Sequence, residues 1–283
     1  MKPRTPTHPD LVRRVAIRAM AEAGREIGLL VLKGGNALAV VYGIGGRTSL
    51  DLDYSLASDF ADVGVAEERI TAHLAASFRD AGFSVFDVRF LLRPPEPEAE
   101  WWGGYEVQFK LSPAADAALD LEARRRSATV VGLAQERTFK IQISRHEYVG
   151  DALEEDVDGV PIAVYSPALL AAEKLRAICQ QMPEYPYTHH RRARARDFFD
   201  IRSICLEASV DLATPGNVAL VAKVFAAKKV PLELLGRVES AREFHRPDWP
   251  AVEGSVRSLE GGFDLYFDFV VDVCRRLEAA RHV

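Results

Sequence analysis

Residues 32–56 read LKGGNALAVVYGIGGRTSLDLDYSL and combine a glycine turn, an apolar segment and a short run with two aspartates. The apolar residues 29–32 that lead into it predict a buried strand. Residues 33–35 (Lys-Gly-Gly) predict a tight turn, Asn36 a helix N-cap, and residues 37–42 about two turns of helix. The segment therefore predicts a strand, a turn and a helix N-terminus in direct succession.

The second part of this segment predicts a strand with two carboxylates on one face. In residues 49–55 (SLDLDYS) apolar and polar residues alternate, so Asp51 and Asp53 point to the same side. Adjacent carboxylates repel each other unless a cation compensates them. Mg²⁺ is typically bound by one or two carboxylates and substrate phosphates, and the helix N-terminus upstream would offer backbone N–H groups to such phosphates. Lys33 and Arg47 would add positive charge.

An Asp-x-Asp pair alone is more often a solvated strand face than a metal site. The combined pattern is more specific and resembles the signature of the DNA polymerase β-type nucleotidyltransferase superfamily. More narrowly, it is similar to the AbiEii-type toxins of abortive-infection and type IV toxin–antitoxin systems. The matching residues are Lys33, Gly34, Gly35, Arg47, Ser49, Asp51 and Asp53.

This resemblance implies a nucleotidyltransferase that uses an NTP and Mg²⁺, with Mn²⁺ as the alternative ion. It implies that Asp51 and Asp53 hold the metal and are catalytic. It further implies that the nucleotide is bound by the glycine turn and its surroundings, namely by Lys33, Gly34, Gly35, Asn36, Arg47 and Ser49.

Two further segments resemble motifs of the same family. Residues 172–177 (AEKLRA) resemble its Glu-Lys-Leu helix, and the resemblance implies that Lys174 is catalytic and neutralises charge as pyrophosphate leaves. Residues 194–201 (RARDFFDI) resemble its Arg-x-Lys-Asp-x-x-Asp helix, with Arg196 in place of the lysine.

In the second motif the resemblance implies that Arg196 and Asp197 bind nucleotide and that Asp200 is catalytic. Helical spacing places Asp197 and Asp200 on one face and allows Arg196 to reach Asp200. Asp200 could instead orient Lys174 or Arg196 without touching substrate. For the arginines, a surface salt-bridge network is an equally good interpretation.

A third carboxylate is expected on the strand beside the Asp-x-Asp strand. Residues 138–144 (TFKIQIS) predict that strand, and the resemblance places the third carboxylate at Gln142. An amide can offer an oxygen to a hydrated metal ion but cannot act as a general base. Glu106, on a neighbouring predicted strand, is the alternative, and the sequence does not decide between them.

Composition describes an ordinary globular protein. The chain has 283 residues, 48% of them hydrophobic and 27% charged, with a net charge of −5 that argues against a generally basic nucleic-acid coat. It shows neither a long apolar run nor the apolar core of a signal peptide, so we expect a cytoplasmic protein without a membrane segment. Cys179, Cys205 and Cys274 are widely spaced and predict core residues.

The order of predicted elements indicates an α+β fold. We expect a polymerase β-like nucleotidyltransferase domain over residues 1–165, with a mixed sheet flanked by helices, and an all-helical domain over residues 166–283, with the active site between them. Ser166 and Pro167 give the second domain a clear helix start. Predicted helices span 10–26, 65–81, 113–126, 167–181, 193–208, 215–226, 232–243 and 262–281, and predicted strands span 83–92, 105–111, 138–144 and 160–165.

The resemblance also indicates a biological role. It implies transfer of NMP to an RNA, with tRNA as the expected acceptor, by a toxin whose cognate antitoxin is encoded nearby. Residues 183–192 (PEYPYTHHRR) interleave tyrosine and histidine with basic residues, a composition suited to stacking on bases, although an ordinary loop would look the same. The alternatives are transfer to a small molecule or a protein hydroxyl, and a nucleotide-binding module without turnover.

Overall fold

The computed structural model of the chain describes residues 8–46, 51–96, 99–130, 136–188, 190–256 and 258–281. Arg47 and Ser49, the expected nucleotide-binding residues, and His189 of the basic stretch 183–192 lie outside the described residues. The chain divides into two compact units. The first comprises Met1–Val41, Ser49–Val149 and Leu153–Val164, and the second comprises Tyr42–Thr48, Gly150–Ala152 and Tyr165–Val283.

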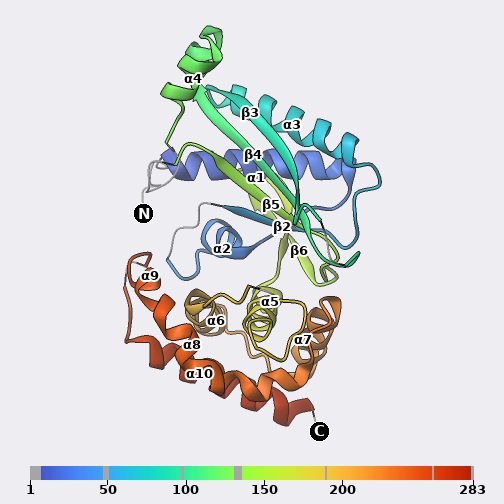
Figure 1. Cartoon of the computed structure of the whole chain (residues 1–283), viewed down its shortest axis with the longest axis vertical. Helices are drawn as coiled ribbons and strands as arrows, with labels where there is room; N and C mark the ends of the chain where they lie inside the picture. Colours follow the sequence, from blue (N-terminus) through green and yellow to red (C-terminus); the bar gives the residue numbers. More distant parts are fainter. Residues whose placement is uncertain are drawn as a thin grey trace. The chain divides into compact units, whose positions relative to one another are not determined.

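Within the described residues, the first unit is built around a seven-stranded mixed sheet with the order β3-β4-β5-β2-β1-β7-β6 (Figure 1). Strand β2 runs parallel to β5 and antiparallel to β1, and β4 runs antiparallel to β5. Asp51 therefore immediately precedes a strand in the interior of the sheet, and Asp53 lies on that strand. The strands are β1 (Val31–Lys33), β2 (Leu52–Ser55), β3 (Phe83–Arg93), β4 (Gly104–Pro113), β5 (Phe139–Ser144), β6 (Ala152–Val157) and β7 (Val160–Tyr165).

Two long helices, α1 (His8–Ile27) and α3 (Val63–Asp80), pack together and cover one face of this sheet (Figure 1). The ring of Phe78 in α3 lies 5.6 Å from that of Phe109 in β4. The remaining helical segments of this region are short: α2 (Gly34–Asn36), the π-helical η1 (Ala37–Tyr42), the 3-10 turn η2 (Ala114–Ala118) and α4 (Leu121–Ser127). The single helix predicted over 113–126 is thus divided, because Asp120 caps α4 by accepting from the backbone N–H of Ala123 at 2.8 Å.

Alternation along three neighbouring strands separates an apolar from a polar face. Leu52, Ile141 and Val107 are aligned across β2, β5 and β4, and all three are fully buried. The next residues along each strand point to the opposite, polar face. The alternation predicted for β2 and β5 is confirmed, although β2 begins only at Leu52 and Asp51 lies in the bend before it.

The second unit is helical. Its first helix begins as predicted: the Ser166 hydroxyl accepts from the backbone N–H of Leu169 at 3.2 Å, and Pro167 occupies the first turn. Its aromatic core includes Phe198 stacked on Phe267, with ring centroids 4.9 Å apart. The predicted helix 232–243 is instead a 3-10 segment followed by a short helix. The elements are α5 (Pro167–Cys179), α6 (Ala195–Glu207), α7 (Pro215–Ala227), η3 (Leu232–Ala241), α8 (Arg242–His245), η4 (Arg246–Asp248), α9 (Trp249–Glu253) and α10 (Phe263–Arg281).

The three cysteines are free thiols whose pKa values are raised by burial. Cys179 and Cys274 are buried, and burial raises the pKa of both thiols. Cys205 is partly buried, and its pKa is raised to about 11 for the same reason.

None of the described helices combines the length and the apolar character that a membrane crossing requires.

Strand β4 requires a glycine at position 104. A Cβ on Gly104 would overlap the carbonyl group of Ile143 in β5, lying 2.9 Å from its carbon and 3.0 Å from the Cα of Ser144. Gly104→Ala should therefore lower the free energy of unfolding by about 1–3 kcal/mol, measured by urea denaturation. Gly216→Ala in α7, where a Cβ meets nothing within 4 Å, serves as the control and should preserve or raise stability. Equal stability of Gly104→Ala and wild type would contradict this account.

Candidate active site

The polar face of the sheet carries a row of three side chains from three strands. Asp53 in β2 is paired in register with Gln142 in β5, and Gln142 is paired with Glu106 in β4. One step along the strands, Lys140 in β5 is paired with Gln108 in β4. Residues aligned in this way on one face lie about 5 Å apart from strand to strand. The arrangement brings carboxylates from distant parts of the sequence to one surface.

The glycine turn packs directly against Asp53. Gly34 has a φ of +69°, which favours glycine, and a Cβ added to it would lie 3.1 Å from Cγ of Asp53. Glycine is thus needed here both for the backbone conformation and for the close approach of the carboxylate. The turn and Asp53 form one local structure.

Asn36 does not cap a helix, and that prediction is wrong. The helix starts at Gly34 with Lys33 at the N-cap position and without a side-chain cap, so Asn36 lies within the first turn and is fully buried. Its Nδ2 donates to the backbone carbonyl of Asp51 at 2.7 Å. That carbonyl precedes β2, and the Asn36 amide supplies the hydrogen bond that a strand neighbour would otherwise provide.

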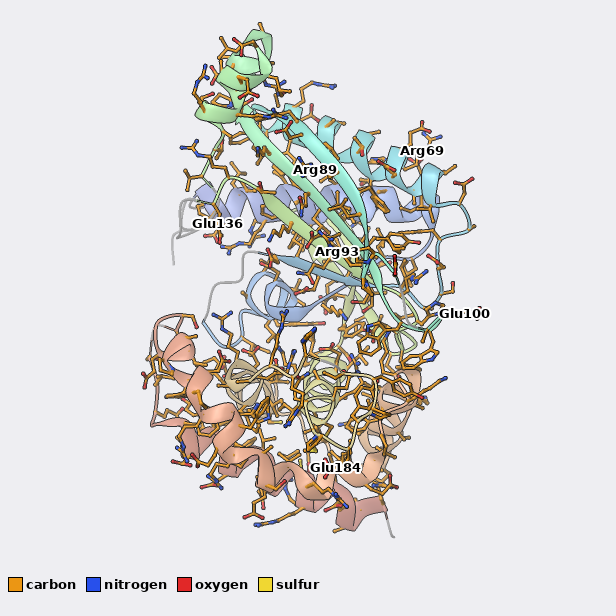
Figure 2. All side chains as sticks on the ribbon, in the orientation of Figure 1. Arg69, Arg89, Arg93, Glu100, Glu136 and Glu184 are labelled. Atoms are coloured by element: carbon orange, nitrogen blue, oxygen red, sulfur yellow. The ribbon has the colours of Figure 1, made fainter. Side chains whose placement is uncertain are left out.

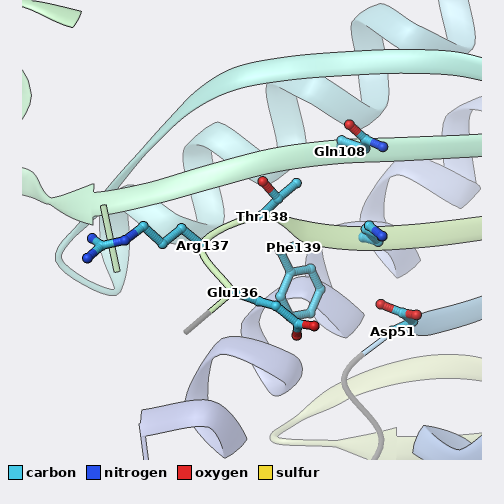
Figure 3. Close-up of a pocket in the computed structure, with 7 residues that line it drawn as sticks. Asp51, Gln108, Glu136, Arg137, Thr138 and Phe139 are labelled. Carbon is cyan, nitrogen blue, oxygen red and sulfur yellow. The ribbon is translucent and has the colours of Figure 1, made fainter. Parts of the chain in front are cut away.

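Asp51 lies at the rim of a polar pocket within the first unit. Burial raises the pKa of Asp51; Lys140 opposes this shift, and the negative charges of Glu136 and Glu106 add to it. Figure 3 shows the carboxylates of Asp51 and Glu136 facing the same space, whereas the Arg137 guanidinium points away. The pocket has a volume of about 410 Å³ and is lined by Asp51, Gln108, Glu136, Arg137, Thr138, Phe139 and Lys140.

Glu106 is held in place by two donors. Its Oε1 accepts from the Arg93 guanidinium at 3.0 Å and from Nε2 of Gln108 at 2.6 Å, and its side chain is only 14% exposed. Burial raises the pKa of Glu106, but these hydrogen bonds outweigh it and the net shift is downward, so the carboxylate is ionised at neutral pH. Arg93 lies at the end of β3 (Figure 2). Gln142, the expected position of the third carboxylate, is exposed beside it.

Two residues of this surface were missed by the sequence analysis. Lys140 shares the exposed face of β5 with Gln142 and could have been found from the same alternation. Glu136 lies in the segment that leads into β5, and its position beside Asp51 follows from strand order, which the sequence does not reveal.

Lys33 has a buried carboxylate partner. Its Nζ lies 3.6 Å from Oε1 of Glu147, and both side chains are nearly inaccessible to solvent. Its backbone pairs with Asp53, which keeps it next to the candidate site. The predicted companions Arg47 and Ser49 lie outside the described residues.

In the second unit, a buried lysine lies between two carboxylates. Nζ of Lys174 in α5 is 2.6 Å from Oδ2 of Asp200 and 3.2 Å from Oδ1 of Asp197, both in α6. Lys174 is 5% exposed and Asp200 is fully buried. Arg194 also pairs with Asp197, whereas Arg196 is exposed. The structure therefore brings Lys174, Asp197 and Asp200 together, and it turns Arg196 toward solvent.

His245 supports the same cluster and was not singled out from the sequence. Its Nδ1 accepts from the backbone N–H of Arg194 at 3.1 Å, and the residue is fully buried. Burial lowers the pKa of His245 to about 4, so the ring is neutral at neutral pH. A neutral ring is required here because a protonated Nδ1 could not accept this hydrogen bond.

The residues around Asp51 and Asp53 fit a divalent cation. Within the described ranges, no group of three or more His, Cys, Asp or Glu side chains has the arrangement of a metal site. The aspartate pair remains the candidate: burial, together with the nearby carboxylates of Glu136 and Glu106, raises the pKa of Asp51, and the missing Cβ of Gly34 lets the glycine turn approach the Asp53 carboxylate closely. A metal with one or two carboxylate ligands that also binds substrate phosphates matches this donor set.

Comparison with known proteins identifies a family and similar folds. The model of the family described as "Nucleotidyl transferase AbiEii toxin, Type IV TA system" matches residues 18–271. A search of curated protein sequences finds no match. The crystal structure of JHP933 from Helicobacter pylori is similar with a TM-score of 0.54 at 16% identity, covering 98% of this chain and 97% of that one. MenT4, a nucleotidyltransferase toxin from Mycobacterium tuberculosis, is similar with a TM-score of 0.51 at 17% identity, covering 95% of this chain and 84% of that one.

The buried position of Lys174 predicts a large effect on stability. Lys174→Met would leave Asp200 and Asp197 buried without their shared cation, so the free energy of unfolding should fall by about 3–5 kcal/mol. The loss should be smaller in mild acid, where the carboxyl groups can protonate, and Asp200→Asn in the same chain should restore part of it. Arg275→Met, which breaks the exposed pair with Glu239, should cost under about 1 kcal/mol and serves as the control. An unchanged melting temperature for Lys174→Met would contradict this interpretation.

Proposed function

The chain belongs to the family of AbiEii nucleotidyltransferase toxins of type IV toxin–antitoxin systems, and from this membership we propose that it transfers NMP from an NTP to an RNA acceptor. The observation that carries the proposal is the row Asp53, Gln142 and Glu106, with Asp51 beside it and the Gly34 turn against it. Carboxylates beside a glycine turn and a helix N-terminus suit a triphosphate together with its metal ion.

In the proposed site, Asp51 and Asp53 would hold Mg²⁺, or Mn²⁺ as the alternative. When bound, such an ion would neutralise phosphate charge and polarise the phosphoryl group. The backbone N–H groups of Gly34, Gly35 and Asn36 would bind triphosphate oxygens. Arg47 and Ser49 are retained as nucleotide-binding candidates on the family resemblance alone.

The proposed reaction is a displacement at the α-phosphorus. The acceptor hydroxyl oxygen forms a bond to this phosphorus, the bond to the departing pyrophosphate breaks, and the hydroxyl proton goes to a carboxylate. We assign the proton to Glu106, since Gln142 cannot accept it. Arg93 and Gln108 would hold the Glu106 carboxylate in position through the hydrogen bonds described above.

We also propose roles for the buried cluster of the helical unit. Lys174 would supply positive charge for the nucleotide phosphates and the departing pyrophosphate, and Asp200 would position its ammonium group. Asp197, which contacts both Lys174 and Arg194, would link these two cations. Arg196 remains a candidate for nucleotide binding because its side chain is exposed.

We propose tRNA as the RNA acceptor and a cytoplasmic setting, with a cognate antitoxin encoded nearby, as the toxin–antitoxin membership suggests. A nucleotide-binding module without turnover is the second candidate, and the presence of Gln142 at the expected carboxylate position favours it. The two differ in one experiment: purified protein is incubated with each α-labelled NTP and divalent metal, with and without total tRNA. Label in the RNA supports the transferase, whereas binding of NTP without transfer to RNA, protein or small molecule supports the module.

The aspartate pair should be indispensable for transfer. Asp51→Asn and Asp53→Asn each remove one of the two metal-binding charges with little change in volume, so transfer should fall by more than a hundredfold while the melting temperature stays close to wild type. Glu154→Gln, an exposed carboxylate on strand β6 of the same sheet, should retain full activity. Substantial transfer by Asp53→Asn would refute the assignment.

Glu106 and Gln142 can be tested as alternative places for one carboxylate. Glu106→Gln should reduce transfer at least a hundredfold while NTP affinity, measured by calorimetry, stays within about threefold, because proton acceptance is lost and the nucleotide contacts remain. Gln142→Glu in the wild-type background should raise transfer or lower the metal concentration it requires. Gln142→Glu should also restore part of the activity when it is combined with Glu106→Gln. Full activity of Glu106→Gln would show that Glu106 is dispensable.

A further inference from the structure

A short basic segment of the helical unit, residues 190–196, is fixed through its backbone. The N–H of Arg192 donates to Oε1 of Gln181 at 2.7 Å, and the N–H of Arg194 donates to the buried ring of His245. The N–H of Ala195 donates to Oδ2 of Asp248 at 3.1 Å. These bonds tie the segment to Gln181 just after α5, to the last residue of α8 and to the end of η4. The backbone is therefore held firmly while its long side chains reach outward.

Three arginines of this segment differ from the other arginines of the unit. Arg191, Arg192 and Arg196 are exposed, and none of them forms an ion pair with a carboxylate among the described residues. Glu184, the carboxylate that precedes them in the loop, pairs with Arg237 at 2.6 Å. The other described arginines of the unit do pair with carboxylates: Arg176, Arg194, Arg202, Arg237, Arg242, Arg246, Arg275, Arg276 and Arg281.

Aromatic rings accompany these cations. The Arg191 guanidinium lies over the ring of Phe244 at 4.4 Å from its centroid, and its Nε donates to the carbonyl of Gln181. Tyr187, 43% exposed, rests its ring against that of Tyr185, with centroids 5.5 Å apart. Tyr185 is buried and donates its hydroxyl to the carbonyl of Lys228 at 2.7 Å. An exposed ring and the fixed guanidinium group of Arg191 thus lie near the end of α5.

We propose that Arg191, Arg192 and Arg196, here called the arginine patch, bind the phosphates of the RNA acceptor and that Tyr187 offers a ring on which a base stacks. This inference rests on the proposed function, since it names where that substrate is held. Arginines without a direct ion pair to a protein carboxylate are available to phosphate, and guanidinium groups bind phosphate through two parallel hydrogen bonds. A fixed backbone reduces the conformational entropy lost on binding.

The composition of the segment favours nucleic acid over an acidic protein. A protein interface generally has an apolar centre, and between residues 183 and 196 no exposed large aliphatic side chain occurs among the described residues. Nucleic-acid interfaces are polar, basic and rich in stacking between bases and aromatic rings. The arginine patch and Tyr187 therefore resemble a nucleic-acid interface more than a protein interface.

The test compares two pairs of neighbouring arginines in the full-length protein. Arg191→Gln/Arg192→Gln removes two patch charges, and Arg275→Gln/Arg276→Gln removes two charges from arginines that pair with Glu239 and Asp211 in the same unit. Arg196 is left intact because it is also a nucleotide-binding candidate. Affinity for a fluorescently labelled tRNA transcript is measured by anisotropy at several KCl concentrations, and NTP affinity by calorimetry. Arg192→Gln alone preserves the contacts of Arg191 and decides the matter if the double variant unfolds.

The patch variant should bind tRNA at least tenfold more weakly than wild type, and the slope of log K against log salt should shrink by about 1–2. The single variant should lose about threefold. The control variant should stay within twofold for tRNA, and both double variants should keep their NTP affinity. Undiminished tRNA affinity of the patch variant, or an equal loss in the control, overturns the proposal. So does polyglutamate binding to wild type with the same dependence on Arg191 and Arg192, which would identify a surface for an acidic protein.

The result also separates this inference from the proposed function. If wild type binds tRNA through the patch but transfers no label to it, the transferase proposal fails and the binding surface stands. If wild type transfers label and the patch variant binds tRNA as well as wild type does, the binding surface alone is wrong.

Discussion

The apolar face that β2, β5 and β4 present to the helices fixes the register of these three strands. Leu52, Ile141 and Val107 are fully buried side by side, and a slip of one residue in any strand would expose an apolar side chain and bury a charged one. The position of every polar group on the other face follows from this packing. Asp53 and Glu106 occupy one row because their apolar neighbours occupy one layer.

The two lysines of the family motifs, Lys33 and Lys174, are each buried beside a carboxylate partner. Lys33 and Lys174 were predicted as cations that meet nucleotide phosphates, yet each is buried beside an acidic residue, Glu147 or Asp200. A buried ammonium group without a partner would cost several kcal/mol, so the carboxylates are a condition for burying these lysines at all. The two helical motifs that contain Lys174 and Asp200 thus encode a buried structural pair.

Much of the architecture could be predicted from local patterns. Helical spacing located α1, α3 and α5, and alternation located β5, because each signal arises within one element. The hydrogen bond from Ser166 was predictable for the same reason. The prediction that Asn36 is an N-cap was wrong because its side-chain amide donates a hydrogen bond to the backbone carbonyl of Asp51, 15 residues away in the chain. Asparagine has a local preference for helix N-caps, but in this fold a tertiary hydrogen bond takes the place of that cap.

The candidate site was predictable only where its residues share a strand or a turn. Asp51, Asp53 and the glycine turn were found in one stretch of sequence. Lys140 could have been found from the alternation along β5, but the position of Glu136 depends on strand order and on a segment that folds back beside Asp51. No local pattern carries this information.

The row Asp53, Gln142 and Glu106 also bears on how related sequences are compared. Two residues that are adjacent across strands, Gln142 and Glu106, are separated by 36 positions in the chain (142 − 106 = 36) but by a single strand spacing on the sheet. A charge can therefore pass from one strand to the next during evolution and remain on the same surface. An alignment read along the chain records such an exchange as a lost acidic residue, whereas the surface of the sheet retains its total charge.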